Sequence, residues 1–280
     1  NLYGAIELLR EADAAGIRPI IGYEAYVAPG KRSEKENKGS GGEYSYHLTM
    51  LAHNTKGFKN LIKLASMAYL EGFYYKPRID KEALAAHAEG LICLSGCING
   101  EVNQFIQNED LDGARKSLGE FVDIFGKDRF FLEVHDHGFA EQSTCTRQMR
   151  EFGREFGLGL VAANDVHFLN QADHDAHDVM ICIGTNSLLL DENRMRYSPE
   201  VYFKTTQEMT ALFKHAPEAL RNTLAIAEKC NVEIKLDSKS SEKYPQFEAP
   251  DGSSREDYFR RVCFEGLEKS YGDRAHTDEE

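Results

Sequence analysis

Short apolar runs alternate with amphipathic segments along most of the chain. The apolar runs predict buried strands at residues 17–28, 46–52, 91–95, 130–134 and in the first half of 160–169. Apolar residues at helical spacing predict helices at 2–15, 58–70, 83–88, 101–107, 112–125, 141–156, 174–183, 208–213, 217–230 and 255–271. This alternation indicates an α/β fold, in which a chain that opens on a helix lacks the strand expected before it.

The stretch 160–169 (LVAANDVHFL) places polar side chains where a predicted strand ends. Side chains two residues apart in a strand project to the same face, so we expect Asp165 and His167 to point together. A carboxylate and an imidazole on one face at the C-terminal end of a buried strand suit a pair of metal ligands. The alternative is an Asp that caps the next helix and a His that packs against a turn.

Three more residues of ligand type lie in or beside predicted strands. Glu24 lies within an apolar strand, where an acid is costly unless it is paired or bound to a metal. His47 lies at the start of the next strand, and Cys97 follows the strand 91–95, although a lone cysteine there is more often a packing residue. Polar residues at strand ends are typical of a β/α barrel. Mixed carboxylate, imidazole and thiolate ligands favour zinc or manganese over magnesium or calcium.

Four further histidines allow a ligand role without requiring one. His135 and His137 follow the strand 130–134, where polar turn residues are an equal explanation. His174 and His177 begin a helix, and their positions favour solvated first-turn residues. We therefore leave all four unassigned.

Two segments carry basic residues beside irregular structure. The loop 71–80 (EGFYYKPRID) contains Lys76 and Arg78 and could meet a phosphate or a base, but a loop held over the core by its own aromatic residues is the favoured alternative. The segment 192–204 is irregular and contains Arg194 and Arg196 in its first half.

The bulk composition limits the classes of protein that remain. With 280 residues, 41% hydrophobic and 28% charged, the chain is ordinary globular material without an apolar run that could cross a membrane. Six scattered cysteines indicate reduced thiols and favour the cytoplasm. The net charge of −13 argues against a broad basic surface for nucleic acid, but metal ions in a carboxylate-lined cleft can reverse the sign locally.

A series of short motifs in one order resembles the polymerase and histidinol phosphatase (PHP) domain of bacterial DNA polymerase III alpha subunits. The motifs are NLYGA (1–5), PIIGYE (19–24), HLTMLA (47–52), EGFYYKPRID (71–80), EGLICLSGC (89–97), NDVH (164–167), NRMR (193–196) and PEALRNT (217–223). The loop 71–80 and the NRMR segment look like the polymerase branch rather than free-standing PHP phosphatases.

The resemblance implies a distorted (β/α)7 barrel of the PHP type that lacks its first strand. It implies a PHP domain over residues 1–236, a linker over 237–252 and the start of the polymerase core over 253–280. By position, the metal ligands of such a domain are Glu24, His47, Cys97, Asp165 and His167. The first His-x-His motif of the family is absent, and we interpret this as truncation of the sequence rather than as a degenerate site.

The function implied by the resemblance is a metal-dependent 3′–5′ exonuclease within a replicative DNA polymerase. Asp165, His167 and Glu24 are its expected catalytic residues. The expected cofactors are up to three Zn²⁺ or Mn²⁺ ions, with Mg²⁺ for a polymerase core outside this chain. The expected partners are primer-template DNA, the rest of the alpha subunit and other holoenzyme subunits, with no membrane. Lys76, Arg78 and Arg194 are weaker candidates for contacting the phosphate.

Two alternative functions stay open at this point. In the first, the domain is a non-catalytic brace that stabilises the polymerase core and its replisome contacts. In the second, the same chemistry acts on a small phosphomonoester.

Overall fold

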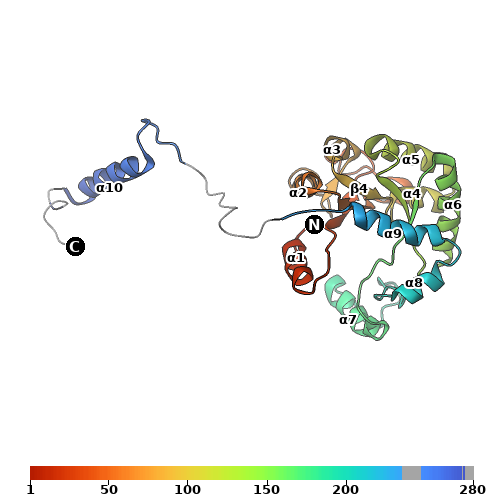
Figure 1. Cartoon of the computed structure of the whole chain (residues 1–280). Coiled ribbons are helices and arrows are strands. Elements are labelled where there is room, and N and C mark those ends of the chain that lie inside the picture. The colour runs from red at the N-terminus through yellow and green to blue at the C-terminus, as the bar shows by residue number, and fades with distance from the viewer. Residues whose placement is uncertain (235–246, 273, 275–280) are drawn as a thin grey trace. The chain divides into compact units, whose positions relative to one another are not determined.

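The structure is a computed structural model that describes residues 1–234, 247–272 and 274. The chain divides into two compact units, residues 1–233 and residues 234–280. The first unit holds the sheet and helices α1 to α9, and the described part of the second contains α10 (Arg255–Tyr271) (Figure 1). The linker predicted at 237–252 lies largely outside the described residues, so the predicted domain boundaries stay predictions.

A single mixed sheet of six strands organises the first unit. Its order is β3-β1-β2-β4-β5-β6, with β3 and β6 at the edges, so the sheet is open. The strand β2 runs antiparallel to both of its neighbours, and the other pairs are parallel. The bounds are β1 Gly22–Val27, β2 Tyr46–Ala52, β3 Arg78–Ile79, β4 Leu91–Leu94, β5 Phe130–Val134 and β6 Leu160–Ala162. The predicted α/β class is confirmed, and an open sheet of this kind accords with a barrel-like PHP fold.

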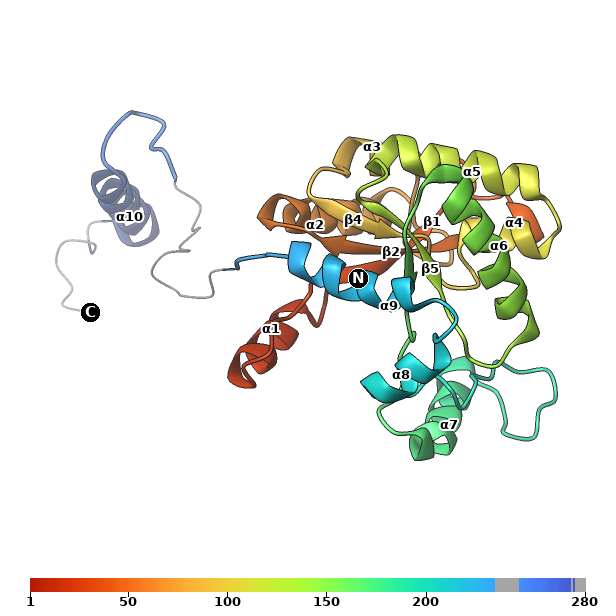
Figure 2. The ribbon, with the colours of Figure 1, turned by 45° about the vertical axis from the view of Figure 1, so that its right-hand side comes forward.

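Helices pack against both faces of the sheet. One face carries the main core, and the other carries a smaller apolar cluster of Ile92, Leu94, Phe131, Val161, Ile226 and Cys230. Their bounds are α1 Ala5–Ala14, α2 Thr55–Leu70, α3 Lys81–His87, α4 Glu101–Gln107, α5 Leu111–Phe125, α6 Ala140–Phe156, α7 His174–Thr185, α8 Thr206–Leu212 and α9 Pro217–Lys229. Figure 2 shows α2, α3, α5 and α6 arranged around the strands. None of the helices in the described residues has the length and apolar character needed to cross a membrane.

The strand β2 shows how the two faces of the sheet differ. Tyr46, Leu48 and Met50 are buried, and Leu48 and Met50 pack in the main core. Because side chains alternate along a strand, the residues between them project to the opposite face. His47 is one of these, so the same alternation that builds the core presents an imidazole on the other side of the sheet.

The structure corrects several predicted boundaries. Helix α2 begins at Thr55, earlier than predicted, because the Asn54 side chain accepts a hydrogen bond from the Gly57 N–H and acts as its N-cap. Helix α1 begins at Ala5, three residues later than predicted. The two-residue strand β3 lies where a loop was predicted, since a pair of bridges to β1 leaves no alternating pattern to detect.

Candidate metal centre

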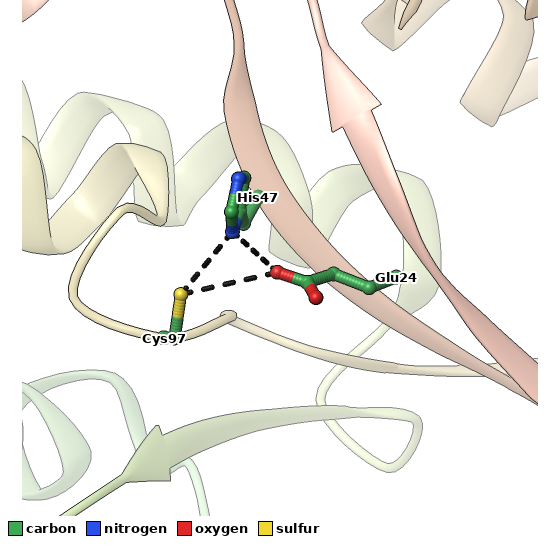
Figure 3. Close-up of side chains that lie close together, drawn as sticks. All are labelled: Glu24, His47 and Cys97. Atoms are coloured by element: carbon green, nitrogen blue, oxygen red, sulfur yellow. Dashed lines mark hydrogen bonds and ion pairs between the residues drawn. The ribbon is translucent and has the colours of Figure 1, made fainter. Parts of the chain in front are cut away.

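Three predicted ligands meet at one point on the face of the sheet opposite the main core. Glu24 lies on β1, His47 on the antiparallel neighbour β2, and Cys97 in the loop after β4. The register pairs Tyr26 with His47, so Glu24 is the diagonal neighbour of His47 on the same face. One donor atom from each of the three residues lies within 4.8 Å of the other two (Figure 3).

The three side chains contact one another directly. His47 Nδ1 forms an ion pair with Glu24 Oε1, and it lies 3.3 Å from Cys97 Sγ. Cys97 Sγ is 3.9 Å from Glu24 Oε1. A carboxylate, an imidazole and a thiol that converge in this way form a donor set of the kind that zinc prefers. The donor atoms of these three residues therefore fit a metal ion. In the part of the chain that the structure describes, they are the one group of three or more such ligands.

The pKa values of two triad residues, Glu24 and Cys97, are shifted in opposite directions in the metal-free chain. Burial alone opposes ionisation of Glu24, but the hydrogen bond and charge of His47, with His167 and His135 nearby, lower its pKa. Burial, followed by the charge of Glu24, raises the pKa of the Cys97 thiol. The thiol is therefore protonated in the metal-free chain, and binding a metal as thiolate releases that proton.

The backbone around Cys97 explains how the loop reaches β2. Gly96 has φ +83°, and a Cβ at this position would lie 2.4 Å from the His47 carbonyl oxygen. Only glycine permits this close approach. The Asn103 side chain donates a hydrogen bond of 3.0 Å to the Cys97 carbonyl. The loop is thus held against β2 and α4 on either side of the thiol.

Asp165 and His167 lie close together, but not for the reason the sequence indicated. The strand β6 ends at Ala162, and Asp165 has φ +49°, so the pair is not on a strand. An irregular segment instead brings His167 Nδ1 to 2.7 Å from the Asp165 carbonyl oxygen and to 3.8 Å from Asp165 Oδ1. Neither residue joins the triad within ligand distance. They act on it through charge, since His167 lowers the pKa of Glu24 and Asp165 raises that of Cys97.

Sequence reasoning left one pair of residues beside the triad unassigned. Glu133 and His135 are both buried, and their side chains meet at 2.8 Å. Glu133 Oε2 also accepts a hydrogen bond from the Gly96 N–H, next to Cys97. The signal was present, because an acid and a histidine two residues apart lie at the end of an apolar strand, as Asp165 and His167 were expected to do.

The three weaker candidates for phosphate contact occupy different environments. Lys76 is exposed, with its Nζ 5.5 Å from the centre of the Tyr26 ring, which in turn meets the His47 ring edge-on. Arg78 is fully buried, and four backbone carbonyls accept its hydrogen bonds, those of Gly72, Tyr44, Arg32 and Glu34. Arg194 is paired with Asp178 through two hydrogen bonds. Of the three, only Lys76 has an exposed charge.

Comparison with known proteins places the triad in a family. The family model of the PHP domain matches residues 1–137, which include Glu24, His47 and Cys97 but not Asp165 or His167. This part of the chain is a PHP domain, as the sequence motifs predicted.

Longer matches extend over almost the whole chain. It is 46% identical over 279 residues to the DNA polymerase III subunit alpha of Thermus aquaticus, which covers 98% of this chain and 23% of the relative. It is 42% identical over 273 residues to the subunit of the same name from Borreliella burgdorferi, which covers 97% of this chain and 24% of that relative. The chain thus spans about a quarter of the length of these relatives.

Proposed function

We propose that this chain is the PHP region of a bacterial replicative DNA polymerase subunit, and that its metal centre hydrolyses phosphodiester bonds as a 3′–5′ exonuclease. The observation that carries the proposal is the convergence of Glu24, His47 and Cys97 on one point, with Asp165 and His167 in electrostatic contact. The likeness to named polymerase subunits supports the context of DNA replication. The substrate is then the 3′ end of primer-template DNA, and the partners are the remaining polymerase subunits.

Glu24, His47 and Cys97 would hold the metal, and Asp165 and His167, in the segment after β6, would lie beside it. A bound Zn²⁺ or Mn²⁺ supplies Lewis acidity and lowers the pKa of a bound water. The lowered pKa of Glu24 keeps this carboxylate charged at neutral pH and therefore available as a ligand. The role of Asp165 is to add negative charge beside the triad.

His167 is oriented for proton transfer by the backbone carbonyl of Asp165. A carbonyl oxygen can only accept a hydrogen bond, so the contact with the Asp165 carbonyl requires the proton on His167 Nδ1. This tautomer leaves Nε2 as an acceptor, either for a proton or for a metal. The Tyr197 ring, whose centre lies 4.3 Å from that of His167, packs against the imidazole and limits its rotation.

Lys76 is the residue best placed to steady a phosphate. Its ammonium is exposed and lies over Tyr26, whose ring contacts His47. A cation here attracts the anionic end of a DNA strand toward the triad through a single electrostatic contact. Arg78 and Arg194 are less suited to this role, because backbone carbonyls and Asp178 already accept their hydrogen bonds.

The test is degradation of a 3′-mismatched primer by protein expressed from the complete gene. The assay is run with Zn²⁺ or Mn²⁺ and with a chelator, using the unmodified protein, Asp165→Ala and the control Asp112→Ala. Asp112 is an exposed carboxylate on α5 that pairs with Arg115 and is not part of the triad. We expect metal-dependent loss of the 3′ nucleotide, abolished in Asp165→Ala and retained in Asp112→Ala.

Two other outcomes would replace the proposal. No cleavage, together with a melting temperature that the chelator lowers, would make the centre a metal-bound brace, which its links between β1, β2 and the loop after β4 also favour. Hydrolysis of a small phosphomonoester such as p-nitrophenyl phosphate, with DNA ends intact, would change the substrate class.

A further inference from the structure

A small cavity lies beyond the C-terminal end of β5, beside α6 and the segment that follows α8. Its volume is about 150 Å³. The residues that line it come from the end of β5, from successive turns of α6 and from the segment that follows α8. None of them belongs to the Glu24–His47–Cys97 triad.

The charge that lines this cavity is unbalanced. Arg147 and Arg150 both line it, and neither has an ion-pair or hydrogen-bond partner among the residues that the structure describes. Arg154, one turn further along α6, is in contrast paired with Glu151 at 3.0 Å. One carboxylate, Asp136, also lines the cavity, and its Oδ1 accepts a hydrogen bond from the Gly138 N–H. Two guanidinium groups therefore face a single carboxylate.

The remaining polar groups in the wall can donate hydrogen bonds to an anion. The hydroxyls of Ser143 and Thr146 lie on the same helix as the arginines, and the imidazole of His215 lies on the other side. Thr146 Oγ1 lies 3.4 Å from the His135 carbonyl, a long contact that a stronger acceptor can replace. Arginine and hydroxyl donors around one space are the groups that recognise tetrahedral oxyanions.

The size of the cavity limits what can enter it. A cavity of about 150 Å³ accommodates a molecule of the size of benzene, whereas pockets for drug-sized ligands and cofactors occupy about 300–1,000 Å³. We propose that this cavity is a phosphate-binding site, which takes a single phosphate group as free inorganic phosphate or as the terminal phosphate of a nucleotide whose base stays outside. The site does not depend on the metal centre or on its proposed nuclease activity.

The site is connected to the triad through hydrogen bonds. His135 lines the cavity, and its Nε2 contacts Glu133 Oε1 at 2.8 Å. Glu133 accepts the Gly96 N–H at 3.2 Å, next to Cys97. The other ring nitrogen of His135, Nδ1, is buried without a partner. A phosphate in the cavity is thus separated from the Cys97 loop by one histidine and one carboxylate.

The experiment is calorimetric titration of inorganic phosphate into the whole chain with a chelator present, so that metal-bound phosphate does not contribute. The unmodified protein is compared with Arg147→Gln/Arg150→Gln and with the control Arg154→Gln. Because each arginine supplies a charge-assisted hydrogen bond, we expect the double variant to bind phosphate at least about tenfold more weakly. Arg154→Gln should bind as the unmodified protein does.

A second arm identifies the source of the phosphate. Thymidine 5′-monophosphate that binds more tightly than inorganic phosphate, with thymidine itself silent, assigns the site to a nucleotide end, and equal affinities assign it to free phosphate. If the double variant does not fold, Arg147→Gln alone, at an exposed side chain, must still weaken binding. Absence of saturable binding at millimolar phosphate, or equal affinity in the double variant, would overturn the proposal.

Discussion

Two parts of the candidate centre are built in different ways. Glu24 and His47 are held by the register of two antiparallel strands, whose backbone hydrogen bonds set the distance between their side chains. Asp165 and His167 lie in an irregular loop, where Asp165 has a positive φ of +49°. We call these the strand-borne half and the loop-borne half of the centre.

The supports of the two halves differ accordingly. The strand-borne half lies on a sheet with a fully buried opposite face, so its ligands move only if the core moves. The loop-borne half is held by contacts with other loops, such as the hydrogen bond from the His167 N–H to the Val201 carbonyl and that between His137 Nε2 and the Asn164 carbonyl. We therefore expect the strand-borne half to provide most of the metal affinity, and the side chains of the loop-borne half to change position more readily.

The largest expected effect is on the stability of the strand-borne half. Arg78 ties the loop between β1 and β2 to the loop before β3, through four backbone carbonyls. Arg78→Met removes these donors in a fully buried position and should lower the free energy of unfolding by about 3 kcal/mol or more. Urea denaturation measures this loss. The matched control is Arg154→Met, since an exposed ion pair contributes about 0–1 kcal/mol, and similar values for the two variants would contradict the role of Arg78.

The next effect compares metal affinity in the two halves. His47→Ala removes a member of the triad, so zinc affinity should fall by about 100-fold or more. His167→Ala should lower zinc affinity by only about tenfold, because the His167 ring lies outside ligand distance of the triad. Titration of zinc against a competing chelator gives both values. A larger loss in His167→Ala would show that the loop-borne half binds the metal.

Much of the fold could be predicted from the periodicity of apolar residues, but less of the candidate site could be predicted in this way. The strands β2 and β5 and the helices α4 and α10 occur at the predicted residues, because each has a regular apolar pattern. The two-residue strand β3 has no such pattern. The antiparallel direction of β2, which makes Glu24 and His47 diagonal neighbours, is a property of long-range pairing.

The surroundings of individual residues could not be predicted where local conformation or burial determines them. A positive φ at Asp165 cannot be inferred from an apolar run, so the pair with His167 was placed on a strand. Arg78 was a weak candidate for contacting a phosphate, beside the favoured alternative of a loop held over the core, and the structure buries it completely. Arg194 finds Asp178 across 16 positions of sequence, a contact that no local pattern indicates.

The conformation of Asp165 offers a way to separate strain from chemistry. A non-glycine residue at φ +49° is strained, whereas glycine adopts this conformation freely. Asp165→Gly should therefore unfold at a free energy within about 0.5 kcal/mol of the unmodified protein, and Asp165→Ala about 1 kcal/mol lower. Both variants lose the carboxylate and should lose metal-dependent activity equally. If urea denaturation showed Asp165→Ala to be more stable than Asp165→Gly, the backbone at position 165 would not be strained.

The smallest effect concerns two tyrosines, one near each half, whose pKa is raised to about 12 for different reasons. For Tyr46 the cause is burial, with the charge of Glu101 adding to it, whereas for Tyr202 it is first the hydrogen bond to Glu208. An unfolded tyrosine titrates near pH 10, so the folded chain holds these protons more tightly. The stabilisation is complete below about pH 10 and is lost as the pH rises toward 12.

The tyrosine variants can distinguish the two causes. Relative to Tyr46→Phe, the unmodified protein should lose stability above about pH 10, and about 1 M salt should change this loss little, because burial, its main cause, is not screened. Relative to Tyr202→Phe, the same alkaline loss should shrink in salt, since Tyr202 and Glu208 interact near the surface. Urea denaturation across this pH range at two salt concentrations measures both. Equal salt dependence for the two tyrosines would contradict burial as the main cause of the raised pKa at Tyr46 and the hydrogen bond to Glu208 as the first cause at Tyr202.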